Sequence, residues 1–180
     1  MSTVLKIADH LPHYTYEDYR QWEGRWEIIY GVAYTMSPLA NLYHQSISKR
    51  IENQLFLHLR NQNKYTSFLP VDWQIGEDTI VQPDNCVVRG NPHGSKLTDT
   101  PLIIFEILSP ATAKKDRGLK YQLYQEAGVP YYAIIDPDLH KADVFQLEHG
   151  SYIQKFSARD GKFTFALDEF SFEFNFTEIW

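Results

Sequence analysis

The sequence lacks the marks of a secreted or membrane-bound protein. Cys86 is its only cysteine, so no intramolecular disulfide can form and a disulfide scaffold is excluded. Residues 1–13 have no apolar core flanked by basic residues, so we expect no signal peptide. No apolar run approaches the roughly 18 residues that a membrane-spanning helix needs. These absences favour a cytoplasmic protein.

A basic excess is also missing. The chain has 17 lysines and arginines against 23 aspartates and glutamates, which gives a formal net charge of −6. This balance counts against a nucleic-acid-binding protein, because phosphate contacts usually leave a basic footprint. The objection is weaker for a metal-dependent nuclease, whose site concentrates carboxylates and whose bound cations change the local field. Basic residues do gather locally, at Lys114, Lys115, Arg117 and Lys120.

Nothing in the sequence marks a boundary between domains. There is no internal repeat, no low-complexity tract and no linker rich in Gly and Ser, and 180 residues fall in the usual range for one domain. Hydrophobic residues make up 43% and charged residues 22%, a balance that argues against disorder. We expect one domain over residues 1–180. Its aromatic excess after Tyr121 predicts strands there.

Local patterns predict the elements of the N-terminal part. Thr15 followed by Asp18 resembles a capping box and predicts a short helix to about Trp22. Alternation on both sides of Gly31, over residues 26–36, predicts two strands joined by a tight turn.

A loop is expected from Pro38 to Asn41, which can cap a long helix to about Arg60. The apolar stripe of that helix repeats every four residues, at Ile47, Ile51, Leu55 and Leu59. After it we expect a strand over residues 65–75, broken by Pro70, and another over 79–88, interrupted near Pro83.

The run LIIFEIL at 102–108 is typical of a central strand covered on both faces. A helix is expected over 111–127, ended by Gly128, and a further apolar strand over 131–135. A strand, a helix and a strand at this spacing form a βαβ unit, which predicts a parallel pair in an α/β fold. Short alternating segments follow to the end of the chain.

Glu106 is the residue within LIIFEIL that does not suit a core. Burying a lone carboxylate costs several kcal/mol unless it is paired or coordinates a metal. The alternatives to a functional role are that Glu106 pairs with a buried Arg or Lys, or that its strand lies at an edge of the sheet.

Two further features carry candidate chemistry. Asp84 follows Pro83, which ends or bulges a strand and so can present a side chain, although Pro-Asp is by itself usually a turn. Asp116, Lys120 and Tyr124 fall at steps of four and share one helix face. That face is either a solvated stripe or one that overlooks the end of the preceding strand, where open α/β sheets bind ligands.

Together these pieces resemble the PD-(D/E)xK nuclease superfamily and, within it, the bacterial Uma family of restriction endonucleases. The resemblance runs from about Tyr16 to Val144. It is carried by WEIIYG at 26–31, His44, VQPD at 81–84, FEILSP at 105–110, the Asp116, Lys120 and Tyr124 stripe, and GVPYYAIIDP at 128–137. It implies a restriction-endonuclease-like fold, a mixed sheet flanked by helices with a C-terminal antiparallel extension.

The resemblance implies that Asp84 and Glu106 bind a divalent metal, with the backbone carbonyl of Ile107 as a third ligand, and that Lys120 is catalytic. The sequence departs from the strict superfamily motif, which places the lysine at the position of Leu108. Mg²⁺ or Mn²⁺ is expected, because Mg²⁺ prefers oxygen ligands and uses one or two carboxylates. The implied activity is endonucleolytic hydrolysis of DNA.

Further residues take roles by the same resemblance. Glu27 would complete the acidic cluster or orient the metal-bound water, unless it faces outward from its strand. His44, Asp116 and Tyr124 would support the site, although a lone histidine at a helix start is more often structural. The sequence departs from the family at three supporting positions, Tyr30, Tyr131 and Ala133. These departures affect the expected substrate specificity more than the metal site. The histidines show no zinc-ligand spacing.

Two other functions stay open at this point. A nuclease-like module without chemistry would bind nucleic acid or a protein, and the joint presence of Asp84, Glu106 and Lys120 argues against it. An assembly or regulatory protein is favoured by the acidic charge and by the alternating phenylalanines of residues 170–176, which would mark an interface if exposed. For the nuclease we expect a homodimer, formed through strand edges or this aromatic segment, because duplex cleavage often needs two opposed sites.

Overall fold

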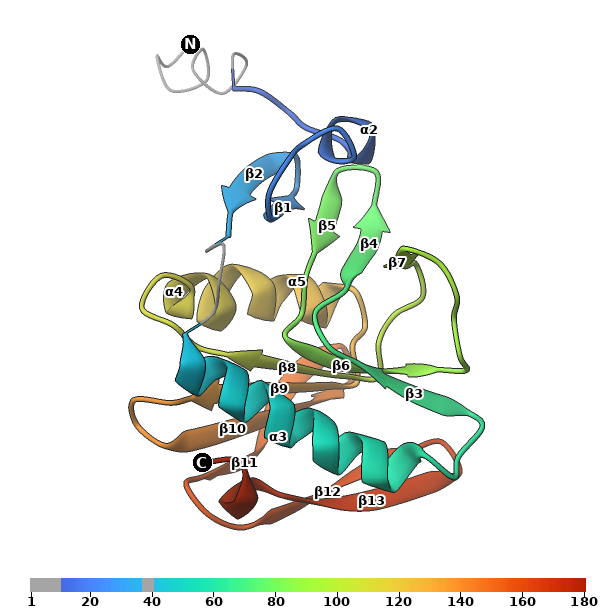
Figure 1. Ribbon diagram of the computed structural model, residues 1–180, viewed down its shortest axis with the longest axis vertical. Coiled ribbons are helices and arrows are strands. Elements are labelled where there is room, and N and C mark those ends of the chain that lie inside the picture. Colours follow the sequence, from blue (N-terminus) through green and yellow to red (C-terminus); the bar gives the residue numbers. More distant parts are fainter. Residues whose placement is uncertain (1–10, 37–40) are drawn as a thin grey trace.

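Two large sheets and a two-stranded hairpin organise the chain, which the computed structural model describes over residues 11–36 and 41–180 (Figure 1). The larger sheet has the strand order β11-β10-β9-β8-β6-β3. Its strands are β3 (Tyr65–Phe68), β6 (Asn85–Arg89), β8 (Ile103–Ile107), β9 (Tyr131–Asp136), β10 (Lys141–Glu148) and β11 (Ser151–Ala158). Only β8 and β9 pair in parallel within it, which confirms the predicted βαβ unit and the mixed sheet.

The smaller sheet has the order β2-β1-β5-β4-β7. Its strands are β1 (Trp26–Ile29), β2 (Val32–Thr35), β4 (Asp72–Gly76), β5 (Thr79–Val81) and β7 (Lys96–Leu97). The tight turn between β1 and β2 is confirmed, with Tyr30 and Gly31 both at positive φ. The two interrupted strands predicted around Pro70 and Pro83 are wrong: at each proline the chain passes from one sheet to the other, so each segment contains two separate strands.

The N-terminal helices start where the capping residues predict. In α2 (Tyr16–Tyr19) the Asp18 carboxylate accepts from the N–H and the hydroxyl of Thr15, but the helix ends before Trp22. In α3 (Leu42–Leu59) the Asn41 side chain accepts from the N–H of His44 at 2.8 Å. The predicted loop from Pro38 and residues 1–10 lie outside the described residues. No helix within the described ranges is long and apolar enough to cross a membrane.

The crossover between β8 and β9 is helical but not regular. It consists of α4 (Ala113–Lys115), the π-helical turn η1 (Asp116–Lys120) and α5 (Tyr121–Glu126). Gly128 ends it at a φ of +78°, as predicted. The π turn was not predicted from the sequence. Since its hydrogen bonds span five residues instead of four, it changes which side chains share a face.

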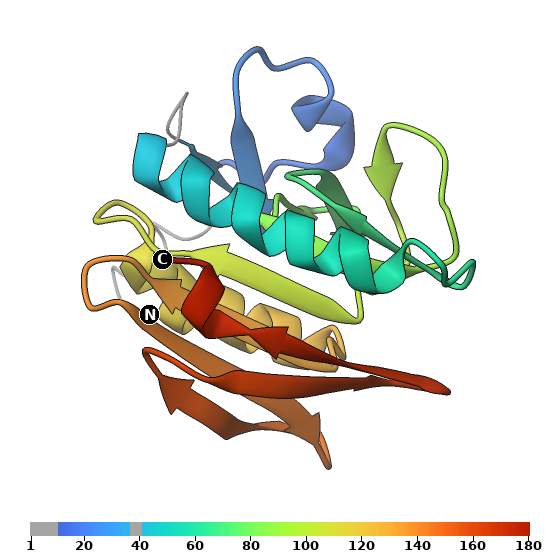
Figure 2. The ribbon, with the colours of Figure 1, turned by 60° about the horizontal axis from the view of Figure 1, so that its bottom comes forward.

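The larger sheet is covered on both faces (Figure 2). On one face, α3 and the hairpin of β12 (Lys162–Leu167) and β13 (Phe170–Asn175) bury the α3 stripe and the odd-numbered residues of β8. On the other face, α5 and the smaller sheet pack around Ile104 and Tyr132. Phe172, Phe174 and Phe176 are buried in the first of these cores, so the condition under which this segment would mark an interface, its exposure, is not met.

Candidate active site

Glu106 faces the α5 side of the larger sheet, because side chains alternate along β8. It is buried, and its Oε1 accepts from Lys120 Nζ at 2.9 Å and from the Tyr124 hydroxyl at 2.6 Å. Of the two alternatives to a functional role, pairing with a buried lysine is therefore observed, whereas β8 is not an edge strand. Burial raises the pKa of Glu106 well above its usual value; Lys120 opposes the rise, and the Asp116 and Asp84 carboxylates add to it.

Lys120 lies at the centre of the charged cluster. Its Nζ is 2.7 Å from Glu27 Oε1, 2.9 Å from Glu106 Oε1 and 3.7 Å from Asp116 Oδ1, and the residue is 2% exposed. Burial alone would lower the pKa of Lys120, but these three carboxylates raise it well above its usual value. The solvated-stripe interpretation of this helix face is wrong, because Asp116, Lys120 and Tyr124 are all buried.

Glu27 on β1 is fully buried, so its interpretation as an outward-facing strand residue is also wrong. Its Oε1 accepts from the Gln82 N–H at 3.0 Å, and its Oε2 contacts Lys115 Nζ. Burial would raise the pKa of Glu27, but Lys120 and Lys115 outweigh it and lower the pKa below its usual value.

Sequence reasoning missed Lys115 as a partner of Glu27 and treated it only as part of a basic cluster. A step of five from Lys115 to Lys120 leaves the two on different faces of a regular α-helix. The π turn lets both ammonium groups reach Glu27. No signal in the sequence identifies that turn.

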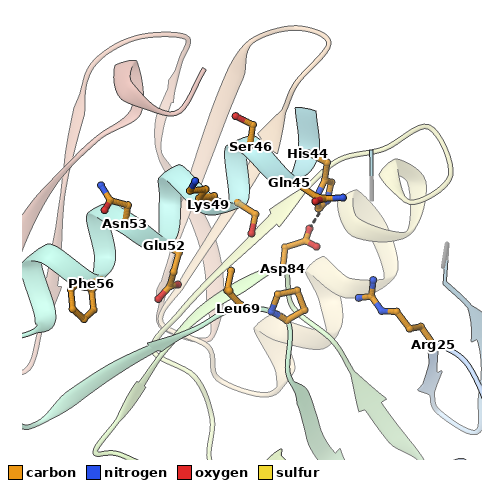
Figure 3. A pocket seen from close by; sticks show the side chains of 12 residues that line it. Arg25, His44, Gln45, Ser46, Lys49, Glu52, Asn53, Phe56, Leu69 and Asp84 are labelled. Atoms are coloured by element: carbon orange, nitrogen blue, oxygen red, sulfur yellow. Dashed lines mark hydrogen bonds and ion pairs between the residues drawn. The ribbon is translucent and has the colours of Figure 1, made fainter. Parts of the chain in front are cut away.

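Asp84 lies just after Pro83, where the chain returns to the larger sheet. Its Oδ2 accepts from the Ile107 N–H at 2.8 Å and lies 3.2 Å from His44 Nε2, an interaction visible in Figure 3. Asp84 is thereby fixed beside the end of β8. Burial would lower the pKa of His44, but the hydrogen bond and the charge of Asp84 raise it.

Asp116 is held at the start of the π turn. Its backbone carbonyl accepts from the Tyr132 hydroxyl at 2.9 Å, a contact that sequence reasoning did not predict. Burial raises the pKa of Asp116, although Lys120 opposes the shift. Among the described residues, Asp116 Oδ1 has no hydrogen-bond partner although it is buried.

A cavity of about 300 Å³ brings these groups together. Its lining residues include Asp84, Glu106, Ile107, Lys115 and Lys120. Asp116 and His44 also line it, whereas Glu27 and Tyr124 lie behind it and contact its lysines and Glu106.

The lining suits a hard divalent cation. Over the described residues, Asp84 Oδ1 and Glu106 Oε2 accept no hydrogen bond, so each carboxylate keeps one oxygen for another partner. No set of three or more His, Cys, Asp and Glu side chains in residues 11–36 and 41–180 is arranged to hold an ion. Mg²⁺ does not need such a set, because it usually binds through one or two carboxylates and keeps several waters.

Comparisons with known proteins identify a family and a similar fold. The model of the Uma2 family, described as "Putative restriction endonuclease", matches residues 16–177. The fold resembles a crystal structure of "a putative nuclease belonging to DUF820" from Anabaena variabilis, with a TM-score of 0.76 and 16% identity over 92% of this chain and 97% of that one. No curated protein matches. The family match and the fold together support a nuclease.

Proposed function

Because the chain belongs to the Uma2 family, we propose that it is a divalent-metal-dependent endonuclease that hydrolyses phosphodiester bonds in DNA. The observation that carries the proposal is the cavity that Asp84 and Glu106 share, each with one oxygen free of hydrogen bonds within the described residues. Burying a carboxylate in a central strand is costly unless it is paired or binds a metal, and the pairing of Glu106 with Lys120 through Oε1 leaves Oε2 for a metal ion.

The residues that would hold Mg²⁺ or Mn²⁺ are Asp84, Glu106 and the backbone carbonyl of Ile107. When bound, such an ion polarises the phosphoryl group and lowers the pKa of a coordinated water. His44 and the Ile107 N–H fix one oxygen of Asp84. Lys120 and Tyr124 fix one oxygen of Glu106. Both carboxylates are thereby held in position before the ion and the substrate bind.

The lysines supply positive charge for the phosphate. Lys120 offsets the negative charge that develops on the phosphoryl oxygens, as preorganised charges do in phosphoryl chemistry. Glu27 positions Lys120 and Lys115 together and stays ionised between them. Lys115 is the more accessible of the two, with 14% of its side chain exposed against 2% for Lys120.

Cleavage of plasmid and oligonucleotide DNA with Mg²⁺ or Mn²⁺ tests the proposal. We expect the wild-type protein to cleave, and Asp84→Asn and Glu106→Gln to lose cleavage while keeping their fold by circular dichroism. Glu173→Gln is the matched control, because Glu173 is an exposed strand residue paired with Lys162 and remote from the cavity lining. Cleavage that survives in both site variants contradicts the proposal.

A further inference from the structure

A groove of about 960 Å³ runs along α3 and opens beside the cavity (Figure 3). The two share Arg25, His44 and Asp84 in their linings. From His44 to Phe56 the groove follows about 18 Å of helix, at about 1.5 Å per residue. A ligand that lies in it therefore reaches the candidate active site without leaving the surface.

Two large apolar side chains lie exposed in this groove. Phe56 is 56% and Leu69 52% exposed, and Pro70 lies next to Leu69 in the lining. The stripe that anchors α3 lies on another face of the helix, so packing of the fold does not account for Phe56. Within the described residues the Phe56 ring stacks on no other aromatic ring. Its exposed surface can contact a flat ligand.

Polar groups lie beside these apolar surfaces. In the described part of the chain, the side chains of Ser46, Lys49 and Asn53 have no hydrogen-bond or ion-pair partner, and all three line the groove. Glu52 also lines it, held by the Ser67 hydroxyl at 2.6 Å. A planar ligand with donors and acceptors on its edges, which is the chemistry of a nucleobase, matches this combination.

The charge of the groove favours an unpaired DNA strand over a duplex as its ligand. Arg25 and Lys49 are the basic side chains of its lining, Glu52 and Asp84 oppose them, and the whole chain carries a formal charge of −6. Binding of paired DNA through its phosphates needs a broader basic surface. Stacking and edge contacts to bases need less charge, but they require the bases to be unpaired.

We propose that this groove binds an unpaired stretch of the DNA strand next to the scissile bond, with a base stacked on Phe56. The inference rests on the proposed nuclease function and adds a substrate class to it: single-stranded DNA, or a duplex with unpaired nucleotides. Asn53 and Glu52 contact base edges, and Lys49 and Arg25 contact the phosphates of the same strand.

Fluorescence anisotropy of labelled DNA in EDTA, where no metal-dependent cleavage occurs, tests this proposal. We expect Phe56→Ala to weaken binding of a single-stranded oligonucleotide by roughly 5- to 150-fold, the range that base–aromatic stacking contributes. Phe56→Trp should retain binding. Leu57→Ala is the matched control, because Leu57 is 49% exposed on the same helix but does not line the groove.

A duplex with a few unpaired nucleotides should compete with the single strand, and a fully paired duplex should compete poorly. Equal affinity of Phe56→Ala and wild type, an equal loss in Leu57→Ala, or preference for the paired duplex overturns the groove proposal. If the wild-type protein cleaves DNA but Phe56→Ala binds single-stranded DNA as tightly as wild type, the groove proposal fails and the nuclease function stands. If binding depends on Phe56 but no metal supports cleavage, the nuclease function fails and the groove stands.

Discussion

At the scale of single residues, we expect the stability of the fold to depend most strongly on Lys120, whose ammonium is shared by three buried carboxylates. Lys120→Met keeps most of the stem and leaves Glu27, Glu106 and Asp116 without it. We expect the free energy of unfolding to fall by about 3–5 kcal/mol, the cost of breaking a buried ion pair by removing one partner. Urea denaturation measures the loss, which should shrink at acid pH because the carboxylates can then take up protons.

Adding Glu106→Gln to Lys120→Met removes one uncompensated carboxylate and should restore part of the lost stability.

In protein that stays folded, Lys120→Met should slow hydrolysis by about 10²–10³-fold, as is typical when one preorganised group is lost. The solvated-stripe interpretation predicts a loss of only about 0.2–0.5 kcal/mol. A measured loss in that range would contradict the buried network.

Glu27 and Glu106 should respond to pH in opposite ways. The pKa of Glu27 is lowered in the folded protein, so its carboxylate adds stability above the unfolded pKa of about 4.3, and this is lost as pH falls through the folded pKa. The pKa of Glu106 is raised, so its ionisation costs stability as pH rises from the unfolded towards the folded pKa.

At neutral pH, Glu27→Gln should therefore destabilise the metal-free protein by about 3–5 kcal/mol, whereas Glu106→Gln should leave its stability unchanged or slightly raised. Thermal unfolding of both variants between about pH 2 and 8, a range that extends below the unfolded carboxylate pKa of about 4.3 and so towards the lowered folded pKa of Glu27, measures the contrast. Parallel stability curves for the two variants would refute it.

At the scale of elements, the crossover helix offers a matched pair of glycines. Gly118 lies in the π turn with open space where a Cβ would be, and Gly128 ends the helix at a φ of +78°. Gly118→Ala should raise the free energy of unfolding by about 0.4–1 kcal/mol, because it restricts the unfolded chain. Gly128→Ala should lower it by about 1–2 kcal/mol, the cost of a left-handed residue. Chemical denaturation measures the free energy of unfolding of both variants. Equal changes in the two would contradict the different backbone conformations given to Gly118 and Gly128.

Regular elements with a local cause could be predicted from the sequence. The α3 helix follows from its Asn41 cap and its apolar repeat, and the parallel pair of β8 and β9 follows from LIIFEIL and the spacing to the next apolar run. Sheet membership could not be predicted, because the strands on the two sides of Pro83 find partners far away in the chain. The π turn could not be predicted either, because no pattern in this sequence distinguishes it from a regular helical turn.

The same distinction holds for the candidate site. A carboxylate in an apolar strand singles out Glu106 within the sequence itself, and the family resemblance adds Asp84 and Lys120. Lys115 could not be found this way, because its contact with Glu27 depends on the π turn and on how the smaller sheet packs over the helix.

At the scale of the whole molecule, one of the two interfaces expected for the homodimer remains possible. The aromatic C-terminal segment is buried against Phe105 and cannot form the interface, which leaves the strand edges, such as β11 with its exposed Ile153. We expect sedimentation velocity to show a dimer that Ile153→Lys weakens, because a lysine on an edge strand opposes pairing between chains. A monomer at high protein concentration would contradict this.

The account as a whole depends on Asp84 and Glu106 holding one ion between them. Calorimetric titration of the protein with Mn²⁺ tests this most directly, since it requires neither a known substrate nor turnover. We expect one ion per wild-type chain, the same affinity in Glu173→Gln, and an affinity lowered by more than about 10-fold in both Asp84→Asn and Glu106→Gln, since even residues that only support ligands cost about that much. Equal Mn²⁺ affinity in all four proteins would contradict the shared site.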